Sequence, residues 1–237
     1  MSLARRAAAE LVGTALLVMA VVGSGIMASR LSPSDTGLAL LENSIATGAA
    51  LVALIVALQP VSASFNPVVT LVEKALGLVD WGTAGGLIVA QFAGGLLGTV
   101  LANLMFGLDA VTLSAHVRSG PGLWLGEIVA TVGLLLVVFG TVRSGRADRV
   151  AFAVGGYIAA AYWFTSSTSF ANPAVTLART ITDTFAGIAP ASAPGFVLAQ
   201  LVGGALGFLL VRFLYPSVVT HTADSSAASA ADRKVTS

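Results

Sequence analysis

The sequence contains no cysteine, which excludes disulfide bonds, thiol catalysis and thiolate metal sites. Its two histidines, His116 and His221, are far apart in expected loops or tails and predict no metal or catalytic cluster. Charge is also scarce, because 10% of the residues are charged, against about 25% in ordinary soluble domains. No basic cluster indicates nucleic-acid binding, and no nucleophile–base pair, phosphate-binding loop or cofactor motif indicates an enzyme.

Hydrophobic residues are abundant instead, at 56% of the chain, with a mean hydropathy of +0.91. Without a series of short alternating strands, this composition predicts an all-α membrane protein embedded in a lipid bilayer. Six apolar segments are each long enough to span it, at roughly 20 residues per crossing. They are residues 8–29, 38–60, 82–106, 122–142, 149–167 and 193–215. The first follows Arg5-Arg6 and is interpreted as a retained span, because it is longer than a signal-peptide core and has an internal counterpart.

The basic residues predict an orientation. With the N-terminus in the cytoplasm, nine Lys and Arg residues fall on the inner side and three on the outer side. We therefore expect a multi-pass protein of the cell (inner or plasma) membrane with both termini in the cytoplasm. Residues 216–237, rich in Ser, Ala and Asp, predict a disordered cytoplasmic tail after a single transmembrane domain over residues 1–215.

The two halves of the chain repeat each other, over about 8–106 and 122–215. Glu10-Leu-Val-Gly-Thr in the first half corresponds to Glu127-Ile-Val-Ala-Thr in the second, and Gln91-x-x-Gly-Gly corresponds to Gln200-x-x-Gly-Gly. Because each half holds an odd number of spans, the halves enter the membrane in opposite orientations. Such an inverted repeat places its functional site at the midplane between the halves.

A repeated Asn-Pro element is the central feature. Asn66-Pro67-Val68 and Asn172-Pro173-Ala174 each follow a Phe and precede Thr-Leu, with Ala171 as one extra residue in the second copy. Asn followed by Pro is typical of a helix start. The apolar stretches behind the motifs end near Gly77 and Thr184, too early to span, so we expect two re-entrant half-helices rather than ordinary turns.

Two such half-helices would meet by their N-termini, each with about half a positive charge. If the Asn side-chain oxygens cap the helices, their amide NH₂ groups are free to donate to a permeating water or hydroxyl group, while cations are repelled. Glu10 and Glu127 are carboxylates inside apolar spans, which are costly unless paired. We expect them to accept hydrogen bonds from the backbone amides of the re-entrant loops; a proton relay is the alternative.

With these motifs, nearly the whole chain resembles the major intrinsic protein family, the aquaporins and glycerol facilitators. The resemblance implies six transmembrane helices plus two half-helices in an aquaporin-like inverted repeat. It also implies a homotetramer with a pore in each subunit, and no cofactor or metal.

The resemblance also implies a selectivity filter near the outer mouth. By spacing from the motifs, its positions are Thr47 (or Ala46 without a gap), Ala160, Ser169 and Val175. The family usually has Arg where this chain has Val175, so the expected ring is wide, uncharged and without an aromatic residue. Arg179, four residues further on, is either a partial replacement or outside the path. Val68 stands where the family has Ala, and its effect on the pore width stays open.

A valine at this filter position resembles the bacterial branch associated with arsenic resistance. The expected function is a passive channel for small neutral solutes: water, glycerol or urea, and trivalent arsenite as As(OH)₃. An ion-coupled transporter and a non-conducting structural member of the same fold are the alternatives.

Overall fold

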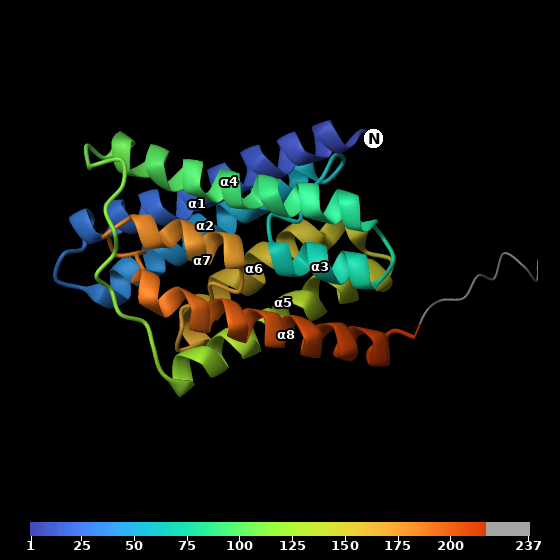
Figure 1. Ribbon diagram of the computed structural model, residues 1–237. Helices are drawn as coiled ribbons and strands as arrows, with labels where there is room; N and C mark the ends of the chain where they lie inside the picture. The colour runs from blue at the N-terminus through green and yellow to red at the C-terminus, as the bar shows by residue number, and fades with distance from the viewer. Residues whose placement is uncertain (217–237) are drawn as a thin grey trace, which may run out of the picture.

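The computed structural model describes residues 1–216, so the expected tail from Ser217 lies outside the described residues. The described chain is built from helices without strands. Long helices run side by side along one axis in Figure 1. They are α1 (Leu3–Leu31), α2 (Thr36–Leu58), α4 (Trp81–Met105), α5 (Pro121–Arg143), α6 (Val150–Phe164) and α8 (Ala193–Leu214).

Five of these helices, all but α6, are long and apolar enough to cross a membrane. This confirms the expected spans to within a few residues at each end. The segment expected at 149–167 is shorter: α6 has 15 residues and is preceded by the 3₁₀ turn η1 (Ala147–Arg149). It ends at Phe164 because Thr165 has an extended backbone and starts the polar loop that leads to Asn172.

Two short helices lie inside the bundle. They are α3 (Pro67–Ala75), and α7 (Pro173–Ala178) with the 3₁₀ turn η2 (Arg179–Ile181) behind it. In Figure 1, α7 and α3 extend from the middle of the bundle toward opposite ends. The expectation of two half-helices that start at the Asn-Pro motifs is therefore confirmed.

The contacts between helices follow the internal repeat. α1 packs closely on α4, α5 packs on α8 in the same way, and α2 and α6 pack on each other across the two halves. Close approach requires small residues: a Cβ on Gly94 would overlap the carbonyl group of Leu11 in α1, and one on Gly203 would lie 2.8 Å from the carbonyl oxygen of Ile128 in α5. The glycine pairs noted in the sequence are thus the crossing points of the helices.

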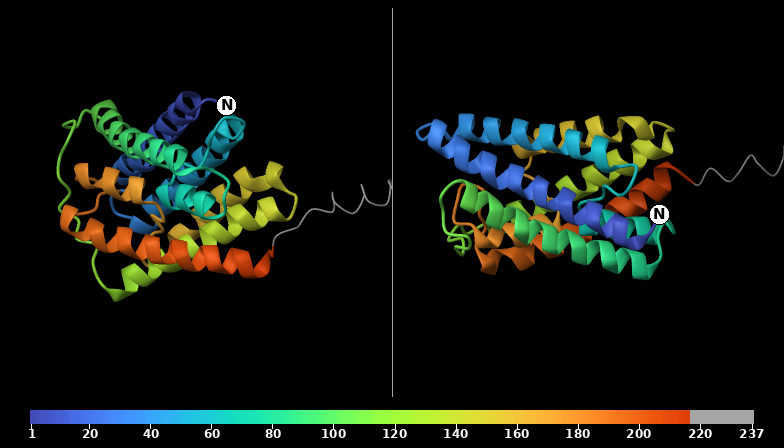
Figure 2. Two further views of the ribbon diagram at one scale, coloured as in Figure 1. Left: turned by 45° about the vertical axis from the view of Figure 1, so that its right-hand side comes forward. Right: turned by 90° about the horizontal axis from the view of Figure 1, so that it is seen from above.

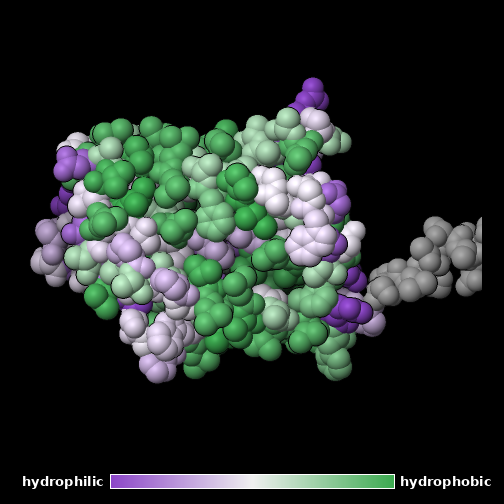
Figure 3. Space-filling model, in the orientation of Figure 1, coloured by the Kyte–Doolittle hydropathy of each residue, from purple (hydrophilic) through white to green (hydrophobic). Residues whose placement is uncertain are grey.

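The surface separates into an apolar middle and polar ends. Figure 3 shows hydrophobic residues over the middle of the bundle and hydrophilic residues gathered at its two ends. The start of α1 and the end of α8 lie at the same end, as the views in Figure 2 show. The loop between α4 and α5, residues 106–120, runs across the opposite end and is bonded to residues 180–192, for example by Thr112 N to Ile181 O (3.1 Å).

Candidate functional site: a path through the bundle

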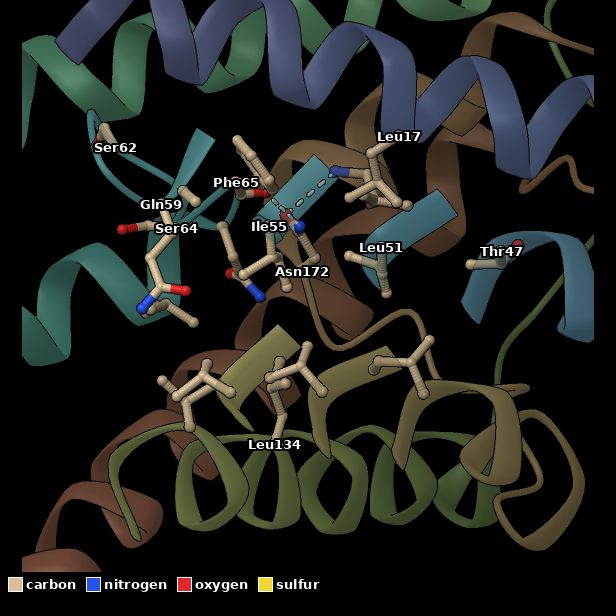
Figure 4. Close-up of a pocket in the computed structure, with 18 of the residues that line it drawn as sticks. Leu17, Thr47, Leu51, Ile55, Gln59, Ser62, Ser64, Phe65, Leu134 and Asn172 are labelled. Carbon is tan, nitrogen blue, oxygen red and sulfur yellow. Dashed lines mark hydrogen bonds between the residues drawn. The ribbon is translucent and has the colours of Figure 1, made fainter. Parts of the chain in front are cut away.

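A cavity of about 510 Å³ runs between the two halves. Its walls are mostly apolar side chains spaced at helical intervals, such as Leu51 and Ile55 on α2 and Ile158 on α6. Its polar lining includes residues of the loops before α3 and α7, such as Ser64 and Ser169. In Figure 4, Phe65 and Asn172 lie midway between Gln59 and Ser62 at one end and Thr47 at the other.

The two motif asparagines line the middle of this cavity. Asn66 Oδ1 accepts a hydrogen bond from Val68 N (2.9 Å), and Asn172 Oδ1 accepts from Ala174 N (2.9 Å), so each caps its own half-helix. Both N-caps have extended backbones and are followed by Pro at the first helical position. Capping by the asparagine oxygens, expected from the sequence, is confirmed.

The amide groups of these asparagines are less free than expected. Asn66 Nδ2 donates to the carbonyl oxygen of Ala171 (2.7 Å), and Asn172 Nδ2 donates to that of Phe65 (2.7 Å). One hydrogen of each NH₂ is thus engaged across the midplane, and the other is left to face the path. Each asparagine therefore keeps one N–H outside these bonds, while the other N–H holds the opposite loop, a second role that the sequence did not predict.

The pairing also corrects the alignment of the motifs. Phe65 and Ala171 both have a φ of +48° and both present their carbonyl group to the opposite asparagine. Phe65 therefore corresponds to Ala171, and not to Phe170 as the shared Phe suggested. A left-handed backbone is uncommon for residues other than glycine. Here it turns the carbonyl group toward the partner loop.

Glu10 and Glu127 hold the two loops from behind. Both are fully buried, and they accept from backbone amides: Glu10 from Ser64 N (2.9 Å) and Phe65 N (2.7 Å), Glu127 from Phe170 N (2.8 Å) and Ala171 N (2.8 Å). The expected hydrogen bonds from the re-entrant loops are confirmed. Charge-assisted bonds of this kind offset the cost of burying a carboxylate.

Two further pairs, which the sequence reasoning missed, extend these networks. Gln91 Nε2 bridges Glu10 Oε2 (2.8 Å) and Thr70 Oγ1 (2.9 Å). Gln200 Nε2 bridges Glu127 Oε2 (2.6 Å) and Thr176 Oγ1 (2.8 Å). Each glutamine thereby connects the loop-supporting carboxylate to its half-helix. The signal was present, since the Gln and Thr recur in both halves.

The expected filter positions divide into two groups. Thr47, Ser169 and Val175 all line the cavity. Ala160 does not: it is exposed on the outside of α6. The residues of α6 that line the cavity include Ile158 and Tyr162. Ala160 is two residues away from each of them, so its side chain points to roughly the opposite side of the helix.

Tyr162 and Arg179 change the expected character of this end of the cavity. The Tyr162 hydroxyl lies 3.2 Å from Thr47 Oγ1, and Arg179 lies one turn beyond Val175 with its side chain lining the same space. This part of the cavity therefore has an aromatic and a charged side chain in addition to the expected Thr47, Ser169 and Val175. Counting residues from the Asn-Pro motif predicted that Val175 lines the cavity. It did not predict that Arg179 lines the cavity as well.

Val68 turns away from the cavity. It is buried against α8, where its Cγ1 would lie 2.7 Å from a Cβ placed on Gly204. It is absent from the cavity wall, which leaves the pore width to other residues. The absence of a side chain on Gly204 makes room for the larger motif residue.

Apolar spans, two capped half-helices meeting at the centre and a cavity through the middle define a membrane channel. The chain belongs to the major intrinsic protein family, whose model (Major intrinsic protein) matches residues 1–151 and 144–236. It is not an enzyme, because proteins of this family are channels.

Individual relatives agree with this assignment. The chain is 51% identical to "Aquaglyceroporin AqpS" of Rhizobium meliloti over 213 residues, which covers 90% of this chain and 91% of the relative. It is 28% identical to "Probable aquaporin AqpM" of Archaeoglobus fulgidus over 243 residues, covering 90% and 98% of the two chains. The X-ray structure of the aquaglyceroporin from Plasmodium falciparum has the same fold, with a TM-score of 0.67 at 18% identity, over 94% of this chain and 99% of that one.

Proposed function

We propose that this protein is a passive channel for small neutral hydroxylated solutes: water, glycerol or urea, and As(OH)₃. The observation that carries the proposal is the cavity whose walls are mostly apolar side chains and whose lining includes both Asn66 and Asn172. An uncharged solute crosses such walls with little loss of solvation, and the remaining amide hydrogens of the asparagines can donate to its oxygen atoms.

The choice of solutes rests on chemistry and on similarity. The relative at 51% identity is named an aquaglyceroporin, which makes glycerol the first solute to test. Arsenite in its neutral form presents three hydroxyl groups, as glycerol does. Thr47 and Tyr162, whose hydroxyl oxygens lie 3.2 Å apart, both line the cavity and supply hydrogen-bonding partners for either.

The proposal includes the setting of the channel. We place it in the inner or plasma membrane with both termini in the cytoplasm, which the nine-to-three distribution of basic residues supports. We also propose a homotetramer with one pore per subunit, as in the family that the chain resembles. Residues 1–215 then form one channel domain.

An ion-coupled transporter is a weaker candidate. Coupling needs a charged group that is free to bind the ion near the midplane. The carboxylates of Glu10 and Glu127 are instead occupied by loop amides and glutamine side chains.

The test is light scattering from liposomes that contain the purified protein, under gradients of water, glycerol, urea and arsenite. A passive channel gives flux that does not saturate and needs no ion gradient. Flux that requires a proton or sodium gradient would favour the transporter. Absence of flux for every solute would favour a non-conducting member of the fold.

A further inference from the structure

The two half-helices carry opposite charges at equivalent positions. Glu73 follows Asn66 by seven residues in α3, and Arg179 follows Asn172 by seven residues at the end of α7. Both residues line the cavity. In Figure 1, α3 extends toward the end of the bundle at which the N-terminus lies, and α7 extends toward the other end. The carboxylate and the guanidinium group therefore lie toward opposite ends of the cavity.

The surroundings of the two charges differ. Arg179 is 3% exposed, and its Nε donates to the carbonyl oxygen of Ala186. Glu73 is half-buried and is held by one hydroxyl group, because Ser64 Oγ lies 3.1 Å from its Oε1 and 3.0 Å from its Oε2. Within the described chain, no other hydrogen bond and no ion pair reaches this carboxylate. A carboxylate can accept about four hydrogen bonds, so most of this capacity is left for a molecule in the cavity.

The basic residues near Glu73 do not pair with it. Lys74, the next residue of α3, has its ammonium group 5.2 Å from the centre of the Trp81 ring, and it is not part of the cavity wall. Arg6 on α1 lines the cavity, but it is not within ion-pair distance of the carboxylate. A negative charge without a salt-bridge partner therefore lines this end of a mostly apolar cavity.

The donor groups beside Glu73 are already engaged. In Figure 4, Ser64 lies at the same end of the cavity as Gln59 and Ser62. The Gln59 amide donates to a main-chain carbonyl group (3.1 Å), and the Ser62 hydroxyl donates to the buried carboxylate behind the loop (2.6 Å). The Glu73 carboxylate is the charged acceptor at this end, and it fits a molecule that brings its own O–H or N–H donors.

We propose that Glu73 is a specificity-determining residue at the inner mouth of the path, where its carboxylate binds the hydroxyl groups of the permeating solute. The proposal rests on the channel function and the orientation proposed above. A charged acceptor forms stronger hydrogen bonds with O–H donors than a neutral one does. Two hydroxyl groups of one solute molecule can donate to the two carboxylate oxygens at once, so the site favours polyhydroxy solutes over water.

The test is the ratio of glycerol flux to water flux in liposomes, measured by light scattering at low glycerol concentration. Glu73→Gln keeps the size of the side chain but removes its charge. It is expected to lower the ratio roughly threefold, because charge-assisted hydrogen bonds are about twice as strong as neutral ones. Lys74→Gln is the matched control, since it removes a charge from the next residue of α3, outside the cavity wall, and should leave the ratio unchanged. If Glu73→Gln cannot be reconstituted, Glu73→Ala replaces it.

Ser64→Ala separates binding of the solute from support of the loop. It leaves the Glu73 carboxylate in place but removes its hydroxyl donor. If the carboxylate binds the solute directly, the ratio stays at or above the wild-type value. If Glu73 only holds the loop through Ser64, this variant shows the same loss as Glu73→Gln.

The outcomes separate the two proposals. A wild-type protein that conducts no solute would overturn the proposed function before any variant is measured. A conducting wild type whose glycerol-to-water ratio is the same in Glu73→Gln or Glu73→Ala would overturn the role of Glu73. A Ser64→Ala variant that reproduces the loss would overturn it as well, because the effect would then pass through the loop.

Discussion

Asn66 and Asn172 each donate a hydrogen bond to the carbonyl group immediately before the other asparagine, over 2.7 Å in both cases. Each asparagine is at once the cap of its own half-helix and a support of the opposite loop. Each half-helix terminus is therefore held in place by a hydrogen bond that involves the other.

Asn66→Asp tests this reciprocity. The substitution keeps an oxygen that can cap α3 but replaces the donor to Ala171 with a second oxygen. Leaving that buried carbonyl group without a donor costs about 1–3 kcal/mol. We expect a lower melting temperature in detergent and reduced water flux. Asn66→Ala, which removes cap and donor together, serves as the comparison and should be less stable than Asn66→Asp.

Glu127→Gln tests the support behind the second loop. Glutamine has one oxygen where the carboxylate uses two, and its NH₂ group would face the Ala171 amide or the Gln200 side chain. We expect destabilisation of about 1–3 kcal/mol and reduced flux, measured by thermal unfolding and light scattering. Glu10→Gln should behave alike, given its equivalent contacts. Solute flux that follows a pH gradient in the wild type would instead support a proton relay.

Val68 and Gly204 offer a pair of compensating changes. Gly204→Ala places a methyl group 2.7 Å from Val68 Cγ1, and overpacking of this kind costs about 1–3 kcal/mol. Val68→Ala in the same protein removes the obstructing atoms, so the double variant should recover most of the lost thermal stability. A double variant as unstable as Gly204→Ala alone would contradict the packing of Val68 on α8.

The face of α6 that lines the cavity can be mapped with introduced cysteines, because the wild-type chain has none. Ile158→Cys should allow a thiol reagent to block solute flux, since residue 158 lines the cavity. Ala160→Cys should be insensitive, since residue 160 faces outward. Block at Ala160→Cys without block at Ile158→Cys would restore the filter position expected from spacing.

Val175→Arg adds bulk and a second cation next to Arg179. Because Val175 lines the cavity one turn before Arg179, we expect the path to narrow and flux of arsenite and glycerol to fall much more than that of water. Light scattering with each solute provides the comparison, and Val175→Leu serves as the control for bulk without charge. Arsenite flux at the wild-type level would exclude Val175 from the filter.

The sequence predicted the fold and the centre of the site well, because both depend on local signals. Hydrophobic length located the spans, and Asn-Pro located the caps of α3 and α7. The burial cost of Glu10 and Glu127 implied that they have partners, and the loop amides are those partners.

The filter could not be predicted in the same way. Its residues depend on how the loop over residues 165–171 turns, and Thr168, Ser169 and Ala171 have positive φ angles that no residue type there required. Counting residues through that loop gave Ala160, which is exposed, and missed Tyr162, which lines the cavity. The inward direction of Arg179 likewise depends on a carbonyl group at Ala186, which sequence spacing does not place.

The reciprocal pairing of the asparagines has a consequence for biosynthesis. The acceptor for Asn66 is 105 residues further along the chain, so at about 5–20 residues per second the ribosome needs roughly 5 to 20 s to supply it. During that interval the first re-entrant loop is in the nascent chain without its partner. Completion of the pore is therefore a late event in synthesis, and the first half, made alone, would lack a closed constriction.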